Sequence, residues 1–316
     1  MGTENAAGLV VVGPGTPYVV PQTLLTSPTG ISWSTIPIMG ASTDVQYAAQ
    51  LNMCMRATAM IDEYCNQPLR ATVDTETFHG PGGFRCQMKP SGVVRMLTSR
   101  SPVLAVVAAR WSPTIAFPRS WATIDPTRLV PERPQMGVYG TSAPSAAAEG
   151  GQGLLMAPGY ISWATGRESC EVEVTYINGW PHASITTTAT LGSASLVVDD
   201  ITGWAGATGI IHDGATQETI SVTSVTPASS GAVSGPGTLS LATALVAGHA
   251  TGVMVTTMPG TIIQAGVLLA ASQALVRGST ATTVQSVSGG KTSGTTGPKD
   301  LRDMAYQLLR PYRRVL

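Results

Sequence analysis

Histidines and neighbouring acidic residues are the side chains of this chain that could bind a metal ion or transfer protons. The chain has four histidines: His79, His182, His212 and His249. None of them stands at metal-ligand spacing from another. His212 beside Asp213 could form a ligand pair, and Asp199 beside Asp200 could hold a cation through oxygen atoms. A turn at the end of a strand explains both pairs more simply, because no further acidic ligand stands nearby.

No signature of a known catalytic or nucleotide-binding site occurs in the chain. The patterns G-x-x-x-x-G-K-[ST], H-E-x-x-H and G-x-S-x-G are all absent. The glycine-rich pieces VVGPGTP and HGPGGF lack the spacing of a dinucleotide-binding loop and do not open a helix, so they predict turns. We therefore predict that the protein is not an enzyme and that it uses no cofactor and no metal.

The four cysteines predict thiols rather than disulfides. They are Cys54, Cys65, Cys86 and Cys170, and no C-x-x-C pair occurs. Cys54 and Cys65 fall on one predicted helix, where eleven residues span about 16 Å. This separation is too long for a disulfide, so we expect buried thiols in a reducing compartment.

Charge is scarce and is unevenly distributed along the chain. Charged residues make up 11% of the 316 residues and the formal net charge is zero, which argues against non-specific binding of nucleic acid. Residues 85–133 carry a net charge of +6, whereas residues 140–260 carry −7. The two regions are either two solvated faces or the two sides of a head-to-tail contact between subunits, a geometry that closes into rings.

The longest helical pattern covers Thr43–Cys65. Its apolar stripe steps by three and four residues through Tyr47, Leu51, Cys54, Thr58, Ile61 and Cys65. Thr43 and Gln46 fit a capping box, and Pro68 prevents continuation. Met53, Met55 and Met60 do not fit the stripe fully, so we predict a second packed face on this helix, against a neighbouring subunit.

Two further helices are predicted at 261–277 and 298–310. The first is apolar on nearly all sides and should be buried, although its run from Ile262 to Val276 is too short to span a bilayer. The fold class is therefore predicted to be α+β. We expect a small bundle of three main helices, a β-rich core that packs on the first helix, and an inserted all-β module.

The domain organisation follows from changes in composition. Residues 1–40 are rich in proline and predict an extended arm, which packs either on its own core or on a neighbouring subunit. Residues 41–183 and 259–316 form the body, with short strands that include one at 159–163 and a strictly alternating one at 170–176. Residues 184–258 are rich in Thr, Ser and Gly, with turns every 10 to 15 residues or so, and predict an inserted β-sandwich or barrel-like module.

The order of several segments resembles one family. The arm contains PTGISWSTIP, the first helix ends in IDEYCNQPLR, and TVDTETFHGPGG and EVTYINGWPHA follow. The last two helices end in LVRGSTATTVQSV and LLRPYRRVL. This order resembles the head–tail connector, or adaptor, proteins of long-tailed bacteriophages over about residues 15–183 and 260–316. None of these motifs is catalytic.

The resemblance implies a structural virion protein in the neck of the particle, assembled in the host cytoplasm. It implies a homo-oligomeric ring of about twelve copies that extends the DNA channel between the portal protein and a stopper or tail-completion protein. Double-stranded DNA would pass through without sequence readout, and no membrane would be involved. The portal-facing candidates are Leu308, Leu309, Arg310, Tyr312, Arg313 and Arg314, and removal of residues 311–316 is expected to leave the fold intact.

The candidate contacts between subunits come from the helix and from the two charged regions. They are Met53, Met55, Met60, Arg95, Arg100, Arg110, Glu171 and Glu173. Two other function classes remain open. A virion-surface protein could bind host carbohydrate through the inserted module, although Trp204 is the module's only aromatic residue. A cell-wall hydrolase would need paired carboxylates or metal ligands, which the sequence does not display.

Overall fold

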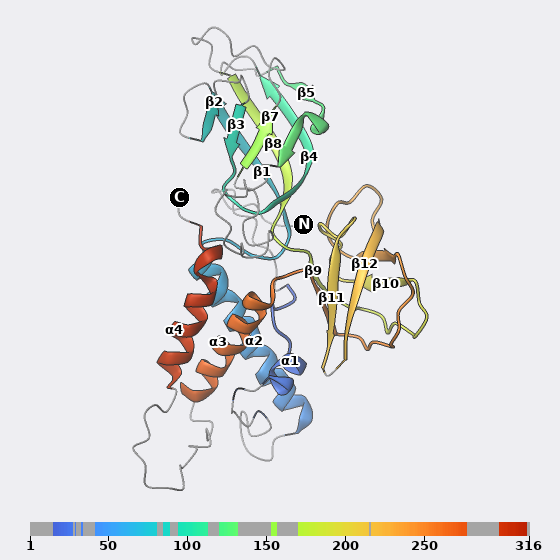
Figure 1. Cartoon of the computed structure of the whole chain (residues 1–316). Coiled ribbons are helices and arrows are strands. Elements are labelled where there is room, and N and C mark those ends of the chain that lie inside the picture. Colours follow the sequence, from blue (N-terminus) through green and yellow to red (C-terminus); the bar gives the residue numbers. More distant parts are fainter. Residues whose placement is uncertain are drawn as a thin grey trace, which may run out of the picture.

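The computed structural model is a mixed α+β structure with three spatially distinct parts (Figure 1). It describes residues 15–27, 29, 33, 42–80, 85–88, 94–112, 120–131, 153–156, 170–214, 216–276 and 297–314. The helices form one part, which we call the helical layer. Two four-stranded sheets form the β body, and a six-stranded sheet forms the β module. The predicted strand at 159–163 and the predicted helix-stop at Gly278 lie outside the described residues.

The helical layer contains α1 (Pro21–Thr26), α2 (Thr43–Cys65), α3 (Gly260–Val276) and α4 (Pro298–Leu309). The turn η3 (Arg310–Tyr312) follows α4. The three long helices that the sequence predicts are therefore confirmed. The capping box at Thr43 is wrong, because Ser42 is the N-cap and its hydroxyl accepts a hydrogen bond from Val45 N at 3.5 Å.

The buried face of α2 differs from the predicted stripe. Its buried residues are Gln50, Met53, Cys54, Ala57, Ile61 and Cys65. Tyr47, which the stripe includes, is exposed, whereas Met53 lies in the core. The prediction counted Tyr47 as buried because it fits the spacing and is aromatic, although it lies near the N-terminal end of the helix. Met53 accordingly packs inside its own chain and is not on a second, outward face.

The β body is built from two antiparallel sheets that share one hydrophobic cluster. The first sheet has the order β1-β8-β4-β5 and contains β1 (Thr72–Gly80), β4 (Val103–Ser112), β5 (Ala122–Ile124) and β8 (Cys170–Asn178). The second has the order β2-β3-β7-β6 and contains β2 (Cys86–Met88), β3 (Val94–Leu97), β6 (Leu129–Pro131) and β7 (Gly153–Met156), with the turn η2 (Pro126–Arg128) before β6. The alternation predicted for β8 is confirmed for Val172, Val174 and Tyr176, which are fully buried, although Glu171 on the opposite face is buried too.

The β module is one antiparallel sheet of order β10-β13-β12-β11-β14-β9. Its strands are β9 (His182–Ser184), β10 (Ser195–Val198), β11 (Thr208–Asp213), β12 (Thr216–Pro227), β13 (Gly237–Leu241) and β14 (Met254–Thr256). It has a hydrophobic cluster of its own around Trp204. The entry and the exit of the module are held together, because Thr257 N donates to Pro181 O at 2.9 Å.

The expectation that the β-rich core packs on the first helix is wrong. The buried side chains of α2 cluster with those of α3 and α4, whereas the side chains inside the β body form a separate cluster. Figure 1 shows the β body at one end of the helical layer and not on its face. Helix α3 is buried nearly all round, as its composition predicts, because α2, α4 and the N-terminal segment together surround it.

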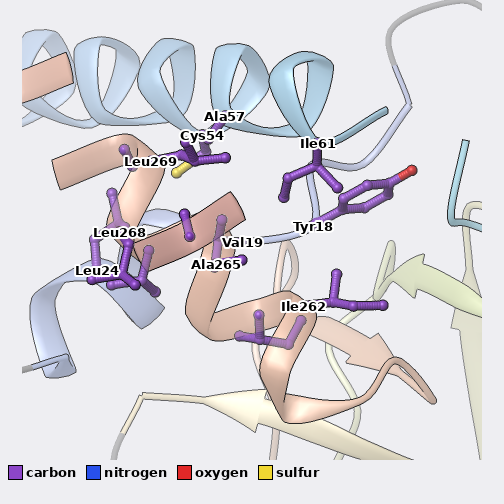
Figure 2. Packing of buried hydrophobic residues seen from close by; sticks show 14 of the residues in the cluster. Tyr18, Val19, Leu24, Cys54, Ala57, Ile61, Ile262, Ala265, Leu268 and Leu269 are labelled. Atoms are coloured by element: carbon purple, nitrogen blue, oxygen red, sulfur yellow. The ribbon is translucent and has the colours of Figure 1, made fainter. Parts of the chain in front are cut away.

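The segment of residues 15–20 joins the helical layer to the β module. Tyr18 and Val19 are fully buried and belong to the cluster of the helical layer, as Figure 2 shows. On the other side, Pro17 O accepts a hydrogen bond from His182 Nε2 at 3.0 Å, and the Thr16 hydroxyl donates to Asp199. This part of the predicted arm therefore packs on its own core, which is one of the two alternatives that the sequence left open.

The hydroxyl of Tyr18 is the centre of this junction. It donates to Asp62 Oδ1 at 2.6 Å and accepts from Leu69 N at 2.8 Å and from Arg70 N at 3.2 Å. Helix α2 ends at Cys65 with Asn66 in the left-handed conformation, so Leu69 and Arg70 lie where the chain leaves the helix for β1. One buried hydroxyl thus fixes the N-terminal segment, the end of α2 and the start of the β body.

A glycine allows the same segment to approach α3. A Cβ atom on Gly266 would lie 2.6 Å from Val19 Cγ2. Such a separation is far below van der Waals contact, so the side chain of Val19 occupies the space that any larger residue at position 266 would need.

Replacing Tyr18 by Phe should lower the free energy of unfolding by about 1–3 kcal/mol. The change removes one buried donor from Asp62 and one acceptor from two backbone amides, and such unsatisfied groups are costly. Chemical denaturation measures the effect. The exposed Tyr47→Phe is the matched control, and equal stability of the two variants would contradict this role for the hydroxyl.

Candidate functional site

Side chains with strongly shifted pKa values are the first place to search for chemistry. Burial raises the pKa of Tyr18 well above its ordinary value and raises the pKa of Asp62 to about 6. Burial also lowers the pKa of His182 to about 4. Tyr18 belongs to the segment 15–20, and Asp62 and His182 are bonded to that segment. The rings of Tyr18 and His182 meet edge to face with centroids 5.7 Å apart. Because these contacts join separate parts of the chain, the three groups fit a structural junction rather than a catalytic cleft.

A second titratable cluster lies inside the β module. The imidazole of His249 has no exposed area, and its Nδ1 lies 3.1 Å from Asp213 Oδ2 while its Nε2 lies 3.0 Å from Glu218 Oε2. Burial acts to raise the pKa of Glu218, but hydrogen bonds from Val246 N, His249 and Ala247 N outweigh it and lower that pKa. The cluster fixes the loop before β14, and no nucleophile stands beside it in the described contacts.

Of the remaining acidic candidates, Asp200 holds a turn, as the sequence favours, whereas Asp199 bonds to β9 and to the N-terminal segment. Asp200 Oδ1 accepts hydrogen bonds from Thr202 N and from Gly235 N, and Asp199 Oδ1 accepts from Ser184 N at 2.6 Å. His212 lies on β11, and its neighbour Asp213 bonds to His249. Within the described ranges, no group of three or more His, Cys, Asp or Glu side chains could hold a metal ion.

The C-terminal segment is anchored on the core and presents cations at its surface. Tyr312 is buried, its hydroxyl lies 2.7 Å from Thr261 Oγ1, and its ring meets Trp180 edge to face. Arg314 N donates to Cys65 O at 2.8 Å, and its guanidinium donates to Thr98 O. These contacts fix residues 312–314 against the end of α2, the start of α3 and the residue that follows β3.

An aromatic stack lies beside this segment. Tyr64 of α2 and Tyr306 of α4 stack with ring centroids 4.4 Å apart and an angle of 5° between their planes. The guanidinium of Arg313 lies 5.5 Å from the centre of the Tyr64 ring, a cation–π contact. Arg310 and Arg313 are both exposed. The result is a rigid cationic surface, which we call the C-terminal surface and define by Arg310, Arg313, Tyr64 and Tyr306.

The structure separates the six portal-facing candidates into two groups. Leu309 and Tyr312 are buried in the helical layer, and Leu308 packs partly against the same cluster. Arg314 is half-buried and bonded to the body. Of the six candidates, Arg310 and Arg313 are the exposed ones. The burial of Tyr312 and the bond from Arg314 N to Cys65 O argue against the expectation that residues 311–316 are dispensable for the fold.

The candidates for contacts between subunits are placed differently by the structure. Arg110 Nε donates to Glu173 Oε1 at 2.7 Å across two neighbouring strands, and Arg100 pairs with Asp74 at 3.2 Å. Glu171 is fully buried and lies 3.0 Å from His79 Nδ1.

The remaining candidates on α2 offer little exposed surface for a contact with a neighbouring subunit. Met60 packs partly against the helical cluster, where Gln273 Nε2 lies 3.5 Å from its sulfur, and Met55 is half-exposed. Arg95 lies on β3. Bonds within the chain therefore occupy several charges that the sequence assigned to neighbours, and a contact through the others stays a prediction.

The structure also bears on the expectations for the cysteines, for Trp204 and for membrane-spanning helices. Cys54, Cys65 and Cys86 are buried and form no disulfide, and burial raises the pKa of Cys54 and of Cys65 to about 12. Trp204 is fully buried in the module. Among the described helices, none is both long enough and apolar enough to cross a membrane.

Sequence reasoning missed Tyr18, Asp62 and the Glu218–His249 pair. Asp62 stands near the polar end of an amphipathic helix, where a carboxylate normally faces water, and Tyr18 lies 44 residues before it. Only the adjacent run of Val19 and Val20 signalled that this part of the arm is buried. Comparison of the chain with models of known families, with curated proteins and with solved structures finds no match.

The pH dependence of stability should change when Asp62 is replaced by Asn. A carboxyl group whose pKa rises from 3.8 to about 6 on folding stabilises the fold below pH 3.8, and this contribution is lost as the pH rises through 6. The unfolding free energy of Asp62→Asn relative to wild type should therefore increase from pH 4 to pH 7, by about 1–3 kcal/mol.

His182 acts in the opposite direction, since its pKa falls on folding and its contribution is lost as the pH falls through about 4. His182 is present in both wild type and Asp62→Asn, so its contribution cancels in the difference between their free energies of unfolding. Denaturant titrations at several pH values measure the difference, with Tyr47→Phe as a control that removes no carboxyl group. A difference that stays constant from pH 4 to pH 7 would show that Asp62 is not buried as described.

Removing residues 311–316 should destabilise the protein, by about 3–5 kcal/mol, because it deletes a buried aromatic side chain and the hydrogen bond from Arg314 N to Cys65 O. Thermal unfolding provides the measurement. A shorter truncation that removes only residues 315 and 316 is the control. Identical melting temperatures for the two truncations would refute the anchoring role of Tyr312.

Proposed function

We propose that the protein is a structural subunit of a bacteriophage neck, an adaptor that forms a ring between the portal protein and the stopper or tail. The proposal begins with the order of sequence segments and gains support from the arrangement of the described residues. The shifted titratable groups that we find are covered by the chain and hold its parts together. A protein that works by assembly needs rigid surfaces more than it needs an open cleft.

The C-terminal surface is the observation that carries the proposal. The contacts of Tyr312 and Arg314 fix its backbone, so that Arg310 and Arg313 are exposed on an ordered base. An exposed guanidinium on an anchored backbone can bind a carboxylate in a bidentate way. An acidic groove of a portal protein is a fitting partner for this surface.

The helical layer suits a ring subunit. In this proposal α2, α3 and α4 act as a three-helix bundle that carries the C-terminal surface, while the β body and the β module face other neighbours. Figure 1 shows the three parts spread apart rather than packed around one centre, which leaves each part with surface for neighbours. An extended subunit of low charge is what an assembled neck requires, because much of its surface is covered in use.

The carbohydrate-binding alternative gains no support from the β module. Sugar sites commonly use exposed aromatic rings, and the single aromatic residue between positions 184 and 258 is Trp204, which is buried. We therefore retain the adaptor function, and the carbohydrate-binding function has no observation in its favour.

Reversing the charges of Arg310 and Arg313 should weaken docking to the portal protein of the same virus by about tenfold or more, because each exposed guanidinium would be replaced by a carboxylate that repels an acidic groove. Co-sedimentation or mass photometry with purified portal rings gives the affinity. Arg56→Glu, a reversal at an exposed position of α2, is the matched control.

Two results would contradict the proposal. Wild-type protein that never associates with the portal rings, at any concentration, would remove the adaptor function. If the Arg310→Glu/Arg313→Glu variant docks as wild type does, the C-terminal surface is not part of the contact with the portal. A ring could then still form, but it would dock through another face of the protein.

A further inference from the structure

Two aliphatic side chains form an exposed tip on the β module. Val246 is 77% exposed and Leu191 is 69% exposed, the highest values of any large hydrophobic side chain among the described residues. They come from two loops that are bonded together, since Gly192 N donates to Leu245 O and Leu245 N donates to Ser193 O, both at 2.9 Å. We call Leu191 and Val246 the module tip.

Buried polar groups hold the module tip in place. The carboxylate of Glu218 accepts hydrogen bonds from Val246 N at 2.7 Å and from Ala247 N at 3.2 Å. His249 and Ala189 exchange two backbone hydrogen bonds of 2.9 Å, and the His249 ring lies between two carboxylates. The loop therefore has little freedom to fold Val246 back onto the protein, and a rigid apolar group loses little entropy when it binds.

An apolar groove of about 490 Å³ lies where the β module meets the β body. Its walls include Leu104 from β4, Trp180 and Pro181 from the junction, Ala205 and Ala207 from the turn before β11, and Thr208 at the start of β11. None of the residues that line it carries a charge. Leu104 is 38% exposed in this groove, so part of the apolar wall faces solvent in the single chain.

The tip and the groove match in chemistry. Residues 186–194 and 242–248 contain no charged residue, so a groove without charges can receive the tip without leaving an ion unpaired. Both surfaces belong to the same chain but lie at different places on it. A contact between such surfaces on two copies is heterologous, and repetition of it closes a ring when the rotation between copies permits.

We propose that Leu191 and Val246 of one subunit insert into the groove between the β body and the β module of a second copy of this chain. The inference rests on the proposed ring and adds a specific contact to it. Two side chains bury much less than the ~1,200 Å² that a stable interface needs, so the contact is one part of a larger interface between neighbours. It gives the β module a task in the assembly, which is to link adjacent subunits.

Cross-linking between two variants that each carry one added cysteine, in a background whose four native cysteines are replaced by Ser, tests the contact. Val246→Cys and Ala205→Cys proteins are mixed at a concentration at which electron microscopy shows rings, and a short bismaleimide is added. Because the two new thiols lie on different chains, a cross-linked pair reports a contact between subunits. The expected yield is about tenfold or more above that of a mixture with Val233→Cys, an exposed valine between β12 and β13.

A second variant gives an independent readout. Val246→Asp should raise the protein concentration at which half of the subunits are in rings by about tenfold, since it places a charge in an apolar groove. Val233→Asp should leave that concentration unchanged. Circular dichroism of both variants shows whether the module stays folded. If a variant unfolds, the cross-linking experiment alone tests the contact.

The outcomes separate this inference from the proposed function. Rings that give no cross-linking above the Val233→Cys control would overturn the contact and leave the adaptor function standing. Protein that forms no ring, alone or on the portal, would overturn both. Protection of the Ala205→Cys thiol from maleimide in the monomer would also overturn the contact, because it would show that the same chain, such as its residues 1–14, already covers the groove.

Discussion

The burial of one tyrosine hydroxyl is the constraint on which the architecture depends. Tyr18 can be buried only if its hydroxyl is bonded, and Asp62 together with the amides of Leu69 and Arg70 provides those bonds. The same segment reaches His182 of the β module through Pro17 O. A short piece of chain near the N-terminus therefore fixes the end of α2 and the entrances to the β body and the β module. Without it, the helical layer and the module would meet through far fewer contacts.

The sequence predicted the regular elements better than their packing. Periodicity located α2, α3, α4 and β8, because each pattern extends over enough residues to average out single exceptions. It failed for the face of α2, where Tyr47 fits the spacing but lies exposed and Met53 does not fit yet lies in the core. Periodicity also failed to predict where the β body packs, since a local pattern does not show which of two hydrophobic clusters a strand will join.

The polar parts of the structure were the hardest to predict. Arg110 with Glu173 and Arg100 with Asp74 pair across neighbouring strands, so charges from separate parts of the sequence meet within one chain. Local segregation of charge therefore overstated the charge available to neighbours. The Glu218–His249 pair and the Tyr18–Asp62 pair join residues 31 and 44 positions apart, and only the folded topology brings them together. Arg310 and Arg313, which the resemblance names as portal-facing candidates, are exposed, whereas Tyr312 between them belongs to the core.

The structure has two exposed surfaces on well-anchored segments: cations on the C-terminal segment, and an aliphatic tip on a loop whose backbone amides bind the buried carboxylate of Glu218. The central proposal is that copies of this chain form a ring on a portal. Electron microscopy of the purified protein incubated with portal rings tests it most directly. The account predicts one closed ring of this chain, with the helical layer nearest the portal. Portal rings that remain bare, beside protein that stays monomeric, would contradict it.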